Sequence, residues 1–136
     1  MDNPDIRWKQ RFQNFEKAFK QLARAVEVSE PSELERAGII QFYEFTFELA
    51  WKTLKDYLKD AGYLIKSPRE TIKQAFQNGY IENGHLWLKM LEKRNDLAHA
   101  YKEEIAAAAL KLIQNDYFNA IQQVYTWLKT QINDSD

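Results

Sequence analysis

The residues of this chain whose types and spacing could do chemistry lie in one stretch, Arg94-Asn95-Asp96-Leu97-Ala98-His99-Ala100-Tyr101. A histidine with a pKa near neutrality can take the proton from a ribose 2′-OH. An arginine can hold a scissile phosphate and stabilise the charge that builds on it. Asn95 could fix the orientation of the imidazole. This set of side chains therefore suits cleavage of RNA without a metal ion.

The spacing within this stretch limits how the site can be built. Residues four apart share a helix face, so Asn95 and His99 are neighbours. Arg94 and His99 are five residues apart, which places them about 140° apart around a helix axis. We therefore expect either that the helix ends near His99, or that a two-fold related copy completes the site. A structural interpretation stays open, since arginine and histidine at a helix end also satisfy terminal carbonyls and the helix dipole.

Composition and charge exclude several other kinds of site. A chain of 136 residues fits a single domain, residues 1–136, with one core. The net charge of −1 gives no general attraction to nucleic acid, so any RNA contact must be local. There is no cysteine, and the two histidines lack metal-ligand spacing, so we expect neither a metal nor a cofactor. The polar N-terminus and the lack of a long apolar run predict a cytoplasmic protein without a membrane span.

The elements that must position the stretch are all predicted to be helical. Start and stop signals place helices at about 4–28, 33–61 and 68–77, from 84 into the reactive stretch, and at 105–128. No strand-like alternation competes with these patterns. We predict an all-α fold, an antiparallel four-helix bundle plus one short helix, because the connections are short.

Apolar spacing indicates which faces of these helices are buried. The second helix carries two apolar strips, and the strip beside its core seam consists of Ile39, Phe42, Phe45 and Leu49. This second strip needs cover from a second subunit, a partner or another helix, and Phe42 and Phe45 are the candidate contact residues. Glu44 and Glu48 share a face of the same helix, as solvated or paired charges or as acids that support the site. In the later helices, the apolar side chains that we predict to face the core are Ile72, Ala75, Phe76, Trp87, Met90, Leu91, Ile105, Ala109, Leu112, Ile113, Tyr117, Ile121, Val124 and Leu128.

With these features together, the chain resembles the HEPN superfamily, and within it the nucleotidyltransferase substrate-binding branch. The resemblance rests on Arg94-x4-His99-x-Tyr101 on the penultimate helix, with Asn95 after the arginine. Three further stretches carry it, and with the motif they cover nearly the whole chain: Arg7-Trp8-Lys9-Gln10-Arg11-Phe12-Gln13-Asn14-Phe15, Phe45-Thr46-Phe47-Glu48-Leu49-Ala50-Trp51-Lys52, and Ser67-Pro68-Arg69-Glu70.

The resemblance implies a function and a partner. HEPN proteins commonly form homodimers with their motifs facing one cleft, and many are metal-independent endoribonucleases. It implies a toxin that cleaves RNA with Arg94 and His99 as the catalytic pair and Asn95 beside them. Members of this branch are often encoded next to a minimal nucleotidyltransferase (MNT), an antitoxin that adds AMP to the motif tyrosine, here Tyr101.

The alternative is a non-catalytic subunit that binds the substrate of a nucleotidyltransferase complex. The transferase itself needs a Gly-Ser turn, which this chain lacks, so nucleotidyl transfer must reside in another protein. Asp96 and Glu103 add negative charge beside the motif, where RNA would bind, and this favours the non-catalytic alternative.

Overall fold

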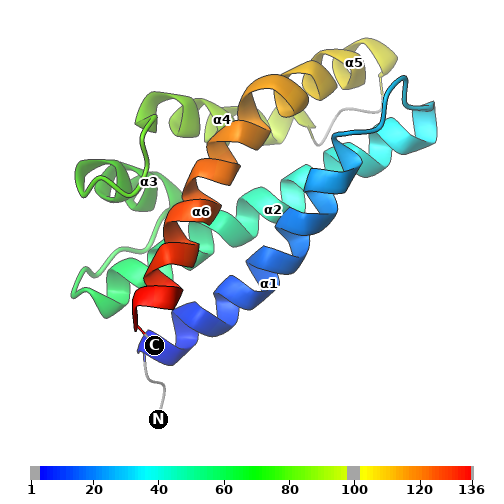
Figure 1. The fold of residues 1–136 in the computed structure, drawn as a ribbon. Coiled ribbons are helices and arrows are strands. Elements are labelled where there is room, and N and C mark those ends of the chain that lie inside the picture. Colours follow the sequence, from blue (N-terminus) through cyan, green and yellow to red (C-terminus); the bar gives the residue numbers. More distant parts are fainter. Residues whose placement is uncertain (1–3, 98–101, 136) are drawn as a thin grey trace.

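The computed structural model describes residues 4–97 and 102–135, and every regular element among them is a helix. The helices are α1 (Pro4–Ala25), α2 (Glu33–Asp60), α3 (Pro68–Gln77), α4 (Gly84–Leu97), α5 (Glu103–Leu112) and α6 (Phe118–Ser135). A π-helical turn, η1 (Ile113–Tyr117), joins α5 to α6, so that these three segments form one long helix (Figure 1). The predicted all-α fold is confirmed.

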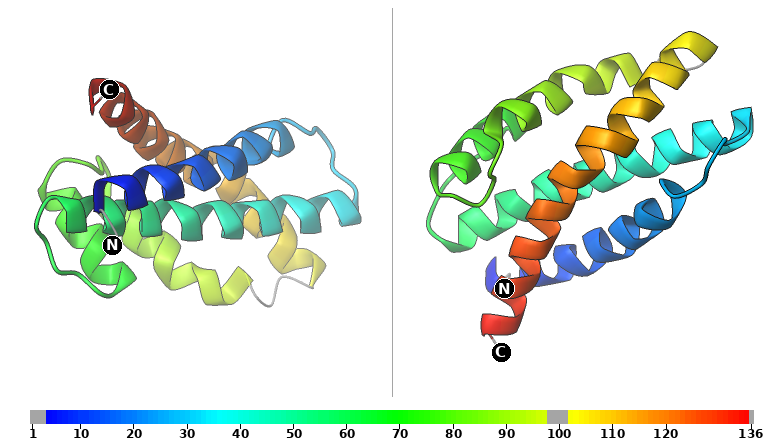
Figure 2. Two further views of the ribbon diagram at one scale, coloured as in Figure 1. Left: turned by 90° about the horizontal axis from the view of Figure 1, so that it is seen from below. Right: turned by 45° about the horizontal axis from the view of Figure 1, so that its top comes forward.

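Helix α2 lies at the centre of the bundle and contacts α1, α3, α5 and α6. Helices α1 and α4 run in one direction, while α2 and the long α5–α6 helix run in the other (Figure 1). The connection from α1 to α2 and the end of α4 lie at the same end of the molecule in both views of Figure 2. The start of α5 lies there as well, and Arg94 belongs to the last turn of α4. No helix in the described part of the chain is long and apolar enough to cross a membrane.

Local signals in the sequence account for where the helices begin and end. The Ser32 hydroxyl accepts a hydrogen bond from the Glu35 backbone N–H, and the Glu35 side chain accepts one from the Ser32 N–H, forming the predicted capping box. Gly62 follows α2 with φ 99°, a left-handed conformation that ends a helix at low cost. Helix α1 ends at Ala25, earlier than the predicted residue 28, because Glu27 and Val28 donate to carbonyls only three residues back.

The core is rich in aromatic rings. One seam of α1 is buried along its length and consists of Trp8, Phe12, Phe15, Phe19 and Leu22. The ring of Phe47 on α2 stacks on Trp87 of α4, with centroids 5.6 Å apart. Tyr43, one turn earlier on α2, stacks on Tyr117 of η1 at 5.5 Å. These ring pairs fix α4 and the long helix against α2.

Ion pairs also join α2 to its neighbours. Arg11 Nε of α1 donates to Oδ2 of Asp56, a buried carboxylate on α2, over 2.6 Å. At the other end of α2, Arg36 Nη2 lies 3.2 Å from Oε1 of Glu103 on α5. The pairing partly neutralises Glu103, which the sequence alone suggested would repel RNA.

The π turn explains an unusual apolar spacing in the last predicted helix. Ile113, Tyr117 and Ile121 are all buried although they follow one another at intervals of four. In an α-helix each such interval rotates the side chain by about 40° away from the core. The wider turn at Ile113–Tyr117 takes up one extra residue and keeps this face inward.

Two predicted inward positions are wrong. Phe76 is 52% exposed, because α3 lies at the edge of the bundle. The Phe76 ring instead covers Gly84, where an added Cβ would lie 2.6 Å from Phe76 Cγ. Ile105, in the first turn of α5, is 37% exposed. The other apolar positions named for the last three predicted helices are buried or half-buried.

Candidate functional site

Arg94 lies in the last turn of α4 and is paired with an acid from α2. Its Nη1 atom donates to Oε1 of Glu48 over 3.3 Å, and 42% of the arginine side chain remains exposed. The two residues are 46 positions apart in sequence. The structure therefore brings the arginine of the motif to one of the two acids that shared a face of the second predicted helix.

Glu48 is itself fixed by a neighbour on α2. The indole Nε1–H of Trp51 donates to Oε2 of Glu48 over 2.9 Å, and Trp51 is only 7% exposed. One carboxylate oxygen thus binds the buried indole and the other binds Arg94. Trp51 was not among the residues predicted for the site, although the three-residue spacing from Glu48 places both on one helix face.

A second acid, Glu44, lies one turn before Glu48. Burial raises the pKa of the Glu44 carboxyl, and the negative charge of Glu48 raises it further. The two acids concentrate negative charge on the α2 side of Arg94. A phosphate that approaches Arg94 must come from the side away from these carboxylates.

The second apolar strip of α2 is only partly covered by the rest of the chain. Ile39 is buried and Leu49 is half-buried, while Phe42 and Phe45 are 38% and 64% exposed. Phe45 lies one turn before Glu48 on the same helix face. An exposed aromatic side chain therefore lies one turn along α2 from the carboxylate that pairs with Arg94.

Two hollows lie beside the start of α5. One, of about 530 Å³, is lined by Arg36, Lys102, Glu103, Glu104 and Ala107. The other, of about 300 Å³, is mainly apolar and is lined by Lys93, Glu104, Ile105, Ala108, Ala109, Leu112 and Tyr117. Helix α5 begins without a side-chain cap on its first N–H groups, since Lys102 occupies the N-cap position.

The remaining residues of the predicted site lie outside what the structure describes. Asn95 belongs to α4 by its backbone, but its side chain is not among the described ones. His99 and Tyr101 fall in residues 98–101, also outside the described ranges. Their approach to Arg94 and the expected completion of the site by a two-fold copy stay predictions. In the described residues, no three histidine, aspartate or glutamate side chains gather as a metal site would require.

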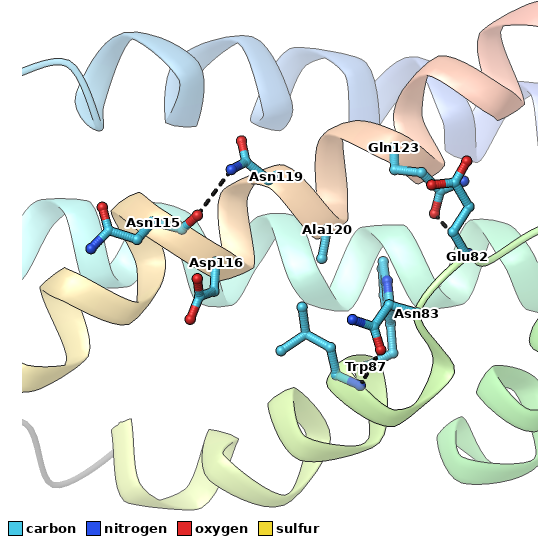
Figure 3. Close-up of a pocket in the computed structure, with 9 residues that line it drawn as sticks. Glu82, Asn83, Trp87, Asn115, Asp116, Asn119, Ala120 and Gln123 are labelled. Carbon is cyan, nitrogen blue, oxygen red and sulfur yellow. Dashed lines mark hydrogen bonds between the residues drawn. The ribbon is translucent and has the colours of Figure 1, made fainter.

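A pocket of about 440 Å³, most of whose lining residues are polar, lies elsewhere, beside the π turn (Figure 3). Its amides mainly bond to the protein itself. Asn83 accepts from the Leu86 N–H at the start of α4, and Asn119 donates to the Asn115 carbonyl. Gln123 accepts from the Glu82 N–H and donates to the Tyr80 carbonyl. Most of these side chains therefore hold local backbone in place, and the Arg94 face is the stronger candidate site.

Comparison with known proteins identifies the chain at family level. The model of the family described as "Nucleotidyltransferase substrate binding protein like" matches residues 10–130. A crystal structure of a protein from Thermus thermophilus superposes with a TM-score of 0.75 at 34% identity, covering 81% of this chain and 94% of that one. No curated protein matches the chain significantly. Since the family model spans nearly its whole length, this chain belongs to the nucleotidyltransferase substrate-binding-protein-like family.

Proposed function

We propose that this chain is the substrate-binding subunit of a complex with a separate nucleotidyltransferase. The observation that carries the proposal is the face over α2 and the last turn of α4. There a half-exposed arginine, Arg94, pairs with Glu48, and the exposed ring of Phe45 lies one turn before Glu48 on α2. An arginine is suited to hold a phosphate, and an exposed aromatic ring is suited to anchor a protein partner. The family to which the chain belongs supports the same interpretation.

The charges around Arg94 favour binding over rapid RNA cleavage. Glu48 contacts the guanidinium and Glu44 lies one turn away, so a polyanion meets negative charge as it approaches. A single phosphate-bearing group, delivered from the side that α2 leaves open, meets less of this repulsion. We therefore place the phosphate of the substrate on Arg94 and the transferase on the Phe42 and Phe45 side.

Docking of the transferase is tested with a purified minimal nucleotidyltransferase as the binding partner. We expect Phe45→Ala to weaken this complex by about five-fold or more, since one anchor side chain often carries such a share of an interface. The matched control is Phe76→Ala, because Phe76 is also about half exposed but lies on α3, away from this face. Equal affinity of the Phe45→Ala and wild-type proteins, measured by isothermal titration, would place the partner elsewhere.

A second function uses the same arginine. A metal-independent endoribonuclease of the HEPN type would use His99 as the base, Arg94 on the phosphate and Asn95 to orient the histidine, in the cleft of a homodimer. The exposed position of Arg94 at the end of α4, five residues before His99, favours it. We expect the isolated protein to cleave RNA in the presence of a chelator, and the His99→Ala and Arg94→Ala proteins to lose this activity. Equal cleavage by His99→Ala would exclude this role.

Control by the partner follows from this second function. The transferase as antitoxin would add AMP to Tyr101 and silence the toxin. Incubated with its transferase and ATP, the chain should then gain the mass of one or more AMP groups, and Tyr101→Phe should abolish the gain. A gain that persists in the Tyr101→Phe protein would move the acceptor to another residue.

A further inference from the structure

We infer that Glu48 is the positioning residue of the Arg94 site and that Trp51 fixes Glu48 in turn. The inference rests on the proposed function, in which Arg94 binds the phosphate of the substrate. Its basis is a line of two hydrogen bonds, from the Trp51 indole to Oε2 of Glu48 and from Arg94 Nη1 to Oε1 of the same carboxylate. These bonds connect a buried side chain to the exposed guanidinium.

The arrangement leaves Arg94 able to bind a phosphate. A guanidinium has five N–H donors, and Glu48 engages only Nη1, so donors remain on the other atoms for a phosphate. A long arginine side chain that moves freely must lose that freedom when it binds. Glu48 restricts the guanidinium before the substrate arrives, which improves affinity without a contact of its own to the substrate.

Glu48 can do this because its own position is fixed. A half-exposed glutamate would otherwise rotate among several rotamers. Trp51 is packed in the core and directs its single N–H at Oε2. One residue before Glu48, the Phe47 ring stacks on Trp87 of α4, so the two helices that carry the carboxylate and the arginine are held together at this level. The Trp51 hydrogen bond and the Phe47–Trp87 stacking therefore both restrict the position of the Glu48 carboxylate.

The substitution Glu48→Gln tests the inference with little change of shape. Trp51 and Arg94 donate to different oxygens of Glu48, and glutamine replaces one of these oxygens by an NH₂ group, so one of the two bonds is lost. The control is Glu44→Gln, which removes a negative charge one turn away on the same helix. If the two acids act only as charges, both substitutions reduce repulsion and both strengthen the binding of an anion. If Glu48 positions Arg94, Glu48→Gln weakens the binding of the anion and Glu44→Gln does not.

The experiment measures binding of a fluorescently labelled nucleoside monophosphate, which carries a single phosphate, by fluorescence anisotropy. We expect Arg94→Ala to weaken binding by about ten-fold or more and Glu48→Gln by about three- to ten-fold, while Glu44→Gln leaves it unchanged or tighter. Trp51→Phe keeps an aromatic ring, smaller than the indole, and removes the N–H, and should reproduce part of the Glu48→Gln loss. In the Arg94→Ala background Glu48→Gln should have no further weakening effect.

The outcomes separate this inference from the proposed function. If Arg94→Ala weakens binding but Glu48→Gln binds as tightly as the wild type or more tightly, the positioning role is wrong and the site stands. If Arg94→Ala has no effect, both the site and its positioning residue are wrong. A Glu48→Gln loss that persists in the Arg94→Ala background shows that Glu48 acts on structure alone, and thermal unfolding of each variant checks this directly.

Discussion

The hydroxyl of Tyr125 on α6 donates a hydrogen bond to Oε2 of Glu16 on α1 over 2.6 Å, and Lys129 Nζ lies 2.9 Å from the same oxygen. This contact shifts the pKa values of both side chains. The bond from Tyr125 is the main cause that lowers the pKa of the Glu16 carboxyl. Burial first, and then the bond to Glu16, raise the pKa of Tyr125 to about 12. The contact therefore makes the stability of the protein depend on pH.

The sign of this dependence follows from the two shifts. The pKa of Glu16 is lower in the folded protein than in the unfolded chain. Its contribution to the free energy of unfolding is therefore fully present above the ordinary pKa of 4.5 and is lost as the pH falls through the pKa of the folded state. The contribution of Tyr125 is present below 10.0 and is lost as the pH rises through about 12. Urea denaturation of Glu16→Gln should show a weaker loss of unfolding free energy in acid than the wild type. The exposed Glu27→Gln protein is the control, and identical acid profiles for Glu16→Gln and wild type would contradict the prediction.

Two buried tyrosine hydroxyls can be removed without breaking a hydrogen bond. Among the described residues, the hydroxyls of Tyr43 and Tyr117 are buried and have no hydrogen-bond partner. Removing an unpaired buried polar group costs nothing in lost bonds, so Tyr117→Phe should leave the free energy of unfolding unchanged or raise it by up to about 1 kcal/mol. Tyr125→Phe, which breaks the bond to Glu16, should lower it by about 1 kcal/mol. A similar loss in both variants would indicate a molecule bound to Tyr117 in the adjoining apolar hollow.

Two glycines should respond differently to alanine. Gly38 lies inside α2, and an added Cβ would meet no atom within 4 Å. Gly38→Ala should therefore raise the free energy of unfolding by about 0.5–1 kcal/mol, since alanine is the better helix former. At Gly84 the new Cβ would lie 2.6 Å from Phe76 Cγ, so Gly84→Ala should destabilise the protein. Melting temperatures that rise for both variants would show that the Phe76 ring moves aside freely.

The π turn predicts that one deletion is tolerated. Removing the exposed Asn115 should convert η1 into a regular α-helical turn and leave the inner faces of α5 and α6 in place. Removing Gln122 from α6 should instead rotate every later side chain by about 100° and expose Leu128, which is buried. Circular dichroism melts compare the two proteins. A Gln122 deletion as stable as the Asn115 deletion would contradict this account of the turn.

Local signals predicted the fold well because each acts over one helical turn. Ser32 with Glu35 fixed the start of α2, and the seam from Trp8 to Leu22 identified the buried face of α1. Periodicity could not place Phe76, whose exposure depends on how α3 packs at the edge of the bundle. It also could not predict that Glu48 meets Arg94, because that contact joins helices 46 residues apart and depends on how they pack. The clue to the π turn, three core residues at intervals of four, was present in the sequence but does not by itself distinguish a π turn from a drifting α-helical face.

The ion pairs along α2 have a consequence for the uniqueness of the fold. From one end of α2 to the other, Arg36 pairs with α5, Glu48 with α4 and Asp56 with α1. Apolar helix faces alone would allow a neighbour to slide by one turn, about 5.4 Å, and still find rings to pack against. Such a slide would separate at least one arginine from its carboxylate and, at Asp56, leave a buried charge unpaired. The charged residues on α2 thus determine the axial positions of α5, α4 and α1 relative to α2.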